Sequence, residues 1–230
     1  MQSTQQELKG HGENDYRELK RVFEDADVVE LFGDTGTGKT TFAHKVAHDA
    51  IKSNASVLYV DTERNLSRSQ AAVLGDAYRY VPIYKELSDL IHALPKKGKT
   101  TPELVVIDSI GFPVLARFSR MDLRERGGAL LDMIGMLGSL KEWAYVRGGQ
   151  AIVTNQPISE MAEAQGKPHR AFGDKAQFGA KELLEPFVVE KGPGRTLIHI
   201  KAHRSRQFGF GTLIAAMVVS DSGVSIEWVT

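Results

Sequence analysis

Eight consecutive residues constrain the fold of this chain more than any other segment: Gly33, Asp34, Thr35, Gly36, Thr37, Gly38, Lys39 and Thr40. They match the phosphate-binding pattern G-x-x-x-x-G-K-[ST] at every fixed position. The apolar run 28–32 before them predicts a buried strand, and the apolar spacing over 41–51 predicts a helix after them. A strand, a glycine-rich turn and a helix in this order predict an α/β fold with a nucleotide site. A glycine-rich hairpin turn is the alternative interpretation.

The residue types of this loop suit a bound triphosphate. Glycines allow successive backbone N–H groups to point into one concavity, and the N-terminus of the following helix also attracts anions. Lys39 is expected to reach the β- and γ-phosphates, and the Thr40 hydroxyl is expected to ligate Mg²⁺. We therefore predict that residues 33–40, together with Thr41, bind ATP or GTP with Mg²⁺.

The chain has the size and composition of one α/β domain, with 230 residues, of which 42% are hydrophobic and 25% charged. It contains no cysteine, which excludes disulfides and cysteine zinc sites and suits a reducing compartment. The first fourteen residues are polar and do not have the pattern of a signal peptide. We expect a flexible segment at 1–14, a single domain at 15–230, a cytoplasmic location and no association with a membrane.

The formal net charge is zero, which is unusual for a dedicated nucleic-acid-binding protein. The charges are unevenly distributed along the chain. Residues 1–30 hold eight acidic and four basic residues, whereas residues 191–220 hold five basic residues and no acidic one. The balanced total leaves open either a positive face for a polyanion or an ordinary solvated surface.

Strand and helix patterns alternate along most of the chain. Strands are predicted at 56–60, 104–107 and 151–153, and helices at 15–23, 67–77, 84–94 and 123–146. After a short predicted helix at 175–184, strands follow at 187–191, 196–201, 213–219 and 224–228, with turns at 192–194 and 221–223. This order predicts a mainly parallel sheet flanked by helices, with antiparallel C-terminal strands at one edge.

Three of the predicted strands end in polar side chains that suit ATP hydrolysis. Asp108 is placed to hold Mg²⁺ through water, and capping of the next helix is its alternative role. Glu63 is the candidate group that accepts a proton from water or polarises it, with Asp61 as a supporting acid, although both residues also suit loop capping. Gln156 is placed to hydrogen-bond the γ-phosphate or the attacking water, although its segment also suits a strand exit.

The ordered motifs G-D-T-G-T-G-K-T, V-D-T-E, L-V-V-I-D-S and V-T-N-Q resemble the ATPase core of the RecA/RadA recombinase family, over about residues 19–230. The segment K-A-H-R-S-R at 201–206 is similar to the K-x-H-R-S segment of archaeal RadB paralogues. The resemblance implies a RecA-like fold with ATP and Mg²⁺. It also implies that Glu63 is catalytic beside Lys39, that Gln156 links ATP to a DNA-binding loop, and that Arg68 lies near the adenine-stacking arginine.

The same resemblance implies two DNA-binding loops, at about residues 114–128 and 157–175. Their basic side chains suit phosphate contacts, which need charge but no fixed sequence: Arg117, Arg120, Arg124, Arg126, Lys167, Arg170 and Lys175. Lys201 or Arg204 is expected to reach the γ-phosphate of a neighbouring subunit. The family's self-assembly motif, Phe-x-x-Ala, occurs only as residues 23–26, where we expect Phe23 to pack against the first strand, so filament formation is not expected.

These features predict a recombinase paralogue that binds ATP and DNA, preferably single-stranded DNA. We expect weak DNA-dependent ATPase activity that assists a main RadA-type recombinase in homologous recombination and repair. The alternative is a KaiC-like switch that uses ATP to bind a protein instead of DNA. KaiC-like proteins usually carry paired glutamates at this point, and Arg64 after Glu63 favours the first interpretation. A small-molecule kinase is disfavoured because the strand after the phosphate loop carries an acid instead of a substrate-binding arginine.

Overall fold

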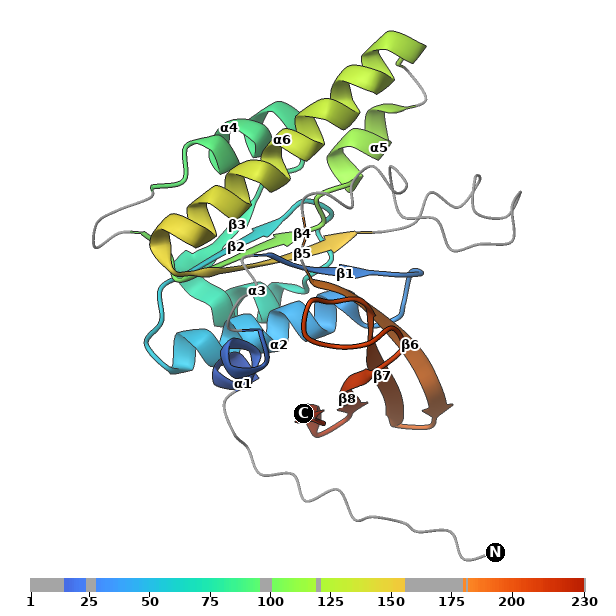
Figure 1. Ribbon diagram of the computed structural model, residues 1–230. Coiled ribbons are helices and arrows are strands. Elements are labelled where there is room, and N and C mark those ends of the chain that lie inside the picture. The colour runs from blue at the N-terminus through green and yellow to red at the C-terminus, as the bar shows by residue number, and fades with distance from the viewer. Residues whose placement is uncertain are drawn as a thin grey trace, which may run out of the picture.

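The computed structural model describes residues 15–23, 28–95, 101–118, 121–155, 180 and 182–229. Within these ranges the strands form a nine-stranded sheet in the order β3-β2-β4-β5-β1-β6-β7-β8-β9. Figure 1 shows helices on both faces of the sheet and an antiparallel extension towards the C-terminus. The expected flexible segment at 1–14 lies outside the described residues.

The parallel part of the sheet contains the four strands that the apolar runs predicted, a short edge strand at 78–80 that they missed, and a strand start at 182–184 that was predicted as helix. These strands are β1 (Val28–Phe32), β2 (Val57–Asp61), β3 (Tyr78–Tyr80), β4 (Leu104–Asp108), β5 (Gln150–Asn155) and the first residues of β6 (Glu182–Gly192). Every residue of β1, β4 and β5 is buried. Because helices cover both faces of a parallel sheet, its strands are mainly apolar, and the positions of the apolar runs could be predicted from sequence.

Helices fill the two layers beside the sheet (Figure 1). One layer contains α1 (Asp15–Val22), α2 (Lys39–Lys52) and α3 (Arg68–Leu74), and the other contains α4 (Tyr84–His92), α5 (Phe112–Phe118) and α6 (Leu123–Arg147). Each layer encloses its own apolar core. Phe42 and Tyr59 belong to the first core, and Leu140 and Trp143 belong to the second.

The C-terminal strands extend the sheet beyond β6. β7 (Arg195–Arg204), β8 (Leu213–Ser220) and β9 (Gly223–Trp228) pair in antiparallel fashion, as predicted. The inner face of this extension carries Ile198 and Met217, which join the core beneath α2. Trp228 packs against Phe42 with ring centroids 5.9 Å apart. The extension therefore lies against the helix that follows the phosphate loop.

A buried ionic cluster attaches α1 to this layer. Lys45 of α2 donates to Asp15 at 2.7 Å and to Asp49 at 2.5 Å. The Trp228 indole N–H donates to the other carboxylate oxygen of Asp15 at 3.1 Å. One carboxylate thus links α1, α2 and β9. Phe23, just after α1, is fully buried and packs edge-to-face on Phe208, as expected for a core residue.

Three local predictions need correction. The predicted helix at 175–184 is wrong over 182–184, because these residues form the start of β6 and pair with β1. Leu183 and Leu184 are buried there, so burial in the sheet overrides the helix preference of this Leu- and Glu-rich segment. Sequence patterns also missed α5 and the short edge strand β3, which has too few apolar residues to show a period. No helix in the described ranges is both long enough and apolar enough to span a membrane.

Candidate nucleotide site

The phosphate loop connects the end of β1 to the start of α2 and borders a cavity of about 500 Å³. Several of the predicted residues line this cavity: Thr35, Gly36, Gly38, Lys39, Thr40, Thr41, Glu63 and Asp108. Gly33, Asp34 and Thr37 belong to the same loop and are not among its lining residues. The Thr37 hydroxyl donates to the Asp34 carbonyl at 2.9 Å, which holds the turn of the loop.

Lys39 is buried beneath the loop that precedes it. Its ammonium group donates to the carbonyl oxygens of Gly33 and Asp34, both at 2.7 Å. Burial lowers the pKa of Lys39, whereas the carboxylates of Asp108, Glu63 and Asp34 act in the opposite direction. The side chain is thus placed at the centre of the loop, where a phosphate oxygen can replace a backbone carbonyl as acceptor.

Gly38 allows the loop to approach the C-terminal extension closely. Its φ is +92°, and a Cβ atom at this position would lie 2.6 Å from Ile198 Cδ1 and 2.7 Å from Met217 Cε. Gly36 has a similar φ of +81°, but a Cβ atom there would meet nothing within 4 Å. The positive φ of Gly38 therefore favours glycine, and a Cβ atom there would also displace the flexible ends of the Ile198 and Met217 side chains.

Gly36 and Gly38 together provide a matched test of the packing between the phosphate loop and the C-terminal extension. Gly38→Ala is expected to destabilise the fold by about 0.5–1.5 kcal/mol more than Gly36→Ala. Both changes strain a positive φ, but only Gly38→Ala also forces the ends of Ile198 and Met217 away from their present positions. Urea unfolding of both variants measures the difference. Equal unfolding free energies would show that Ile198 and Met217 do not restrict this position.

The structure brings together Thr40 and Asp108, the two residues predicted to hold Mg²⁺. The Thr40 hydroxyl donates to Asp108 Oδ1 at 3.2 Å, and both residues line the cavity. Hydroxyl and carboxylate oxygens suit Mg²⁺, which keeps several waters when it binds proteins and phosphates. The chemistry of these residues therefore fits a Mg²⁺ ion, and a direct contact from Thr40 and a water-mediated one from Asp108 remain predictions.

The Asp108 carboxylate accepts hydrogen bonds from three hydroxyl groups, one of them from Thr40. Its Oδ1 also accepts from Thr154, and its Oδ2 accepts from Tyr59 at 2.9 Å. Burial raises the pKa of Asp108, while the hydrogen bonds from Thr154, Tyr59 and Thr40 lower it. Burial also raises the pKa of Tyr59, and the Asp108 charge raises it further, so Tyr59 remains a hydrogen-bond donor.

The structure distinguishes Glu63 from Asp61. From the sequence, each residue could act on the attacking water or cap the following loop. Glu63 lines the cavity beside the phosphate loop. Asp61 is fully buried, and its carboxylate accepts the backbone N–H groups of Glu63, Asn65 and Leu66 at 3.0, 3.3 and 3.4 Å. Asp61 therefore holds the loop that carries Glu63, which is the loop-capping role that the sequence left open for it.

Sequence patterns did not predict the remaining walls of the cavity. Its other lining residues are Asn65, Gln70, Thr154, Thr196, Ile198 and Val219. Arg68, predicted near the adenine, is exposed at the start of α3 and is not among the described lining residues. Gln70 lies two positions further on and completes a capping box with Ser67. The S-x-x-Q pattern was the available signal for a helix that begins beside the cavity.

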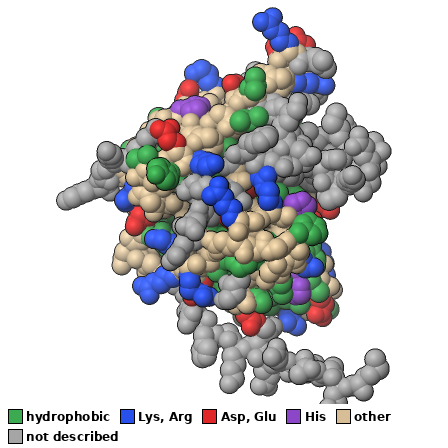
Figure 2. Space-filling view, viewed as in Figure 1, with side chains coloured by type: hydrophobic (Ala, Val, Ile, Leu, Met, Phe, Trp, Pro, Cys, Tyr) green, Lys and Arg blue, Asp and Glu red, His purple; other side chains and the backbone are tan. Residues whose placement is uncertain are grey.

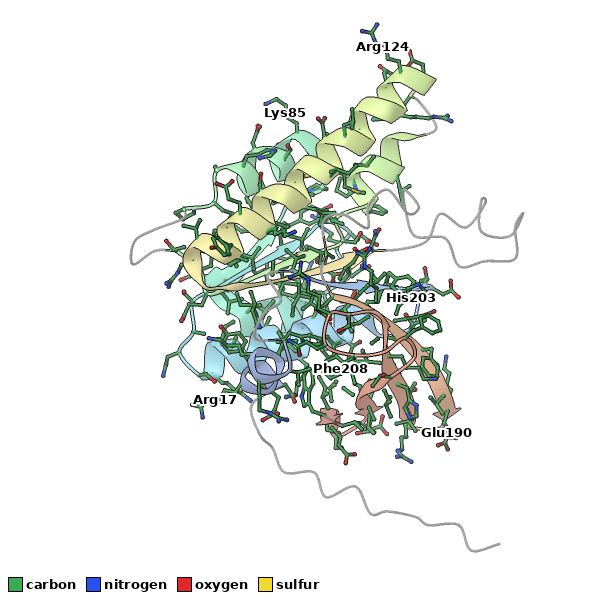
Figure 3. The ribbon with its side chains drawn as sticks, viewed as in Figure 1. Arg17, Lys85, Arg124, Glu190, His203 and Phe208 are labelled. Atoms are coloured by element: carbon green, nitrogen blue, oxygen red, sulfur yellow. The ribbon has the colours of Figure 1, made fainter. Side chains whose placement is uncertain are left out.

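The predicted DNA-binding residues are only partly described. Gln156, Arg120, Lys167, Arg170 and Lys175 lie outside the described residues, and the side chain of Arg117 is also not described. Arg124 is exposed at the N-terminal tip of α6, where Figure 3 shows it pointing away from the sheet. Arg126 is half-buried, and its Nε donates to the Met121 carbonyl at 3.0 Å. Of this set, Arg124 is the residue whose placement best suits a phosphate contact.

Lys201 and Arg204, predicted to act on a neighbouring subunit, lie on β7. The Lys201 ammonium is 4.4 Å from the centroid of the Phe187 ring, and Arg204 donates to the Ala180 carbonyl at 2.8 Å. Neither is among the described residues that line the cavity of this chain. Basic side chains are visible along this part of the surface in Figure 2, between the helical layer and the extension.

The fold and the site together define a RecA-like ATPase core. The phosphate loop follows β1, Asp108 ends β4, and β5 lies between these two strands. No known protein-family model matches the sequence. The chain is 21% identical over 199 residues to the DNA repair and recombination protein RadB of Methanococcoides burtonii, a match that covers 81% of this chain and 84% of that protein.

A second similarity leads to the same group of proteins. The chain is 24% identical over 208 residues to the DNA repair and recombination protein RadB of Thermoplasma acidophilum, which covers 87% of this chain and 86% of that protein. With the fold, the two similarities support a RadB-like protein of the RecA/RadA family. Both similarities therefore point to the family that the ordered motifs resemble.

Proposed function

We propose that this chain is an ATP- and DNA-binding recombinase paralogue with weak, DNA-dependent ATPase activity. It would assist a RadA-type recombinase on single-stranded DNA in homologous recombination and repair. One observation carries the ATPase proposal: Lys39, Thr40, Glu63 and Asp108, from three separate segments, border one cavity. The names of the two RadB relatives support the role in recombination and repair and do not favour the KaiC-like alternative.

Each of these side chains has a distinct task in the proposed reaction. Lys39 would exchange the carbonyls of Gly33 and Asp34 for oxygens of the β- and γ-phosphates. Thr40 and Asp108 would hold Mg²⁺, which neutralises charge on the β- and γ-phosphates. Glu63 would orient the attacking water and accept its proton.

The proposed contact with DNA rests on charge. Arg124 is exposed, and the segment 191–220 has five basic residues and no acidic one. Phosphate contacts of this kind are insensitive to sequence and weaken steeply as salt is added. Gln156 and the basic residues of 157–175 remain predictions for the link between ATP and DNA.

The ATPase rate should therefore be measured with and without single-stranded DNA, over a salt series. We expect modest stimulation by DNA, and a DNA affinity whose logarithm falls by about 0.7 per phosphate contact for each tenfold rise in salt. Arg124→Gln should reduce this slope, whereas Lys52→Gln, an exposed change on α2, should leave it unchanged. No DNA binding at low salt with ATP and Mg²⁺ would contradict the DNA proposal and favour the protein-binding switch.

A further inference from the structure

Tyr59 contacts the metal-binding aspartate from behind the site. It lies on β2 and is fully buried, and its hydroxyl donates to Asp108 Oδ2 at 2.9 Å. It is not among the described residues that line the nucleotide cavity. Tyr59 is therefore placed to affect the site only through Asp108.

The two oxygens of Asp108 face different partners. Oδ1 accepts from Thr40 and Thr154, which both line the cavity, whereas Oδ2 accepts from Tyr59 in the core. The χ2 torsion of an aspartate is broad, so without a partner on each side its carboxylate can rotate. The bond from Tyr59 helps to fix the plane of the carboxylate, so that its other oxygen stays directed at Thr40.

The Tyr59 ring is itself held by packing. His44 of α2 lies edge-on to it, with centroids 6.5 Å apart, and the His44 Nε2 lies 3.2 Å from the carbonyl oxygen of Gln70. On the strand side, Tyr59 sits opposite Val106 and Tyr78 in the sheet register. A rigid phenol at this position can hold the carboxylate more firmly than a mobile side chain.

We propose that Tyr59 is a positioning residue for Mg²⁺, which orients Asp108 so that Oδ1 faces Thr40 and the cavity. The inference rests on the proposed function, because it requires that ATP and Mg²⁺ bind at this site. Groups that hydrogen-bond a metal ligand from behind typically change metal affinity by about 10–100-fold when they are removed. The hydroxyl, not the ring, is the part of Tyr59 that does this.

Tyr59→Phe tests the proposal, because it removes the hydroxyl and keeps the ring against His44. Binding of a fluorescent ATP analogue should be measured while Mg²⁺ is titrated. We expect the half-saturating Mg²⁺ concentration to rise about 10-fold or more. Affinity for the analogue in EDTA should stay unchanged, since Tyr59 does not line the cavity.

Tyr78→Phe is the matched control. Tyr78 occupies the neighbouring strand, and its hydroxyl donates to Asp61 at 3.2 Å instead of to Asp108. This variant should keep the Mg²⁺ dependence of the wild type. Thermal unfolding midpoints of the two variants report any loss of structure separately from the effect on Mg²⁺.

A double-mutant comparison identifies the route of the effect. In an Asp108→Asn background, Tyr59→Phe should have no further effect on the half-saturating Mg²⁺ concentration, because the residue it acts through has already been changed. An unchanged Mg²⁺ dependence in Tyr59→Phe alone would overturn the inference and leave the proposed function intact. Absence of Mg²⁺-dependent nucleotide binding in the wild type would instead overturn the proposed function.

Discussion

Replacement of Lys39 by alanine is expected to abolish tight ATP binding, with a loss of affinity of about 100-fold. Lys39 is the buried cation at the centre of the phosphate loop, and its two hydrogen bonds to Gly33 and Asp34 show that it reaches the inner surface of the turn. Hydrogen bonds to charged groups contribute about 1.5–3 kcal/mol, and each 1.4 kcal/mol changes affinity tenfold. Equilibrium titration with a fluorescent ATP analogue measures the loss.

Lys52→Ala is the control for this change. Lys52 is exposed in the last turn of the same helix, α2, so it tests the removal of one positive charge without altering the loop. We expect its ATP affinity to equal that of the wild type. If Lys39→Ala kept wild-type affinity, residues 33–40 would not be the nucleotide site.

The sequence was most informative where one segment contains the whole signal. The phosphate loop needs only residues 33–40, and the buried strands that end at Asp61 and Asp108 are visible as apolar runs. Carboxyl ends of parallel strands meet at one edge of a sheet, so the relation between Lys39, Glu63 and Asp108 followed from their strand positions. The structure places all three around one cavity.

Residues that lie far from the phosphate loop in the sequence but line the cavity could not be predicted from a local pattern. Thr196, Ile198 and Val219 line the cavity only because the C-terminal extension folds against α2, and an alternating strand pattern does not reveal which other element it covers. In the sequence, Tyr59 is one residue of an apolar strand. Its hydrogen bond to Asp108 depends on the pairing of β2 with β4, which the local sequence does not show. Long-range packing, not local chemistry, decides these positions.

Local preference also failed where the sheet imposed a different structure. Residues 182–184 have helix-favouring side chains. They nevertheless form a strand, because their backbone pairs with the edge of β1 that β5 does not occupy. The Asp61 carboxylate shows the same limit, because sequence could not distinguish a loop-capping acid from a catalytic acid. The distinction comes from the backbone N–H groups that surround Asp61.

Replacement of Glu63 by glutamine is expected to lower the rate of ATP hydrolysis about 10²–10⁴-fold while ATP binding is retained. Glutamine keeps the size of the side chain and its hydrogen-bonding capacity but cannot accept a proton from water at neutral pH. Glu63 lines the cavity beside the loop, so its loss should affect the chemical step more than the affinity. Single-turnover hydrolysis, with ATP binding measured in parallel, separates the two effects.

The control for Glu63 is Glu86→Gln, an exposed change on α4 that should leave the rate unchanged. Asp61→Asn provides the sharper comparison, since Asp61 holds the Glu63 loop by three backbone N–H groups. Its replacement should lower the unfolding free energy as well as the rate. The amide oxygen can still accept the N–H groups of Glu63 and Asn65, but the amide nitrogen cannot accept the bonds that Leu66 and Tyr78 now donate. Glu63→Gln should affect only the rate. A wild-type rate in Glu63→Gln would mean that the attacking water is activated by another group, and that Glu63 only forms part of the cavity wall.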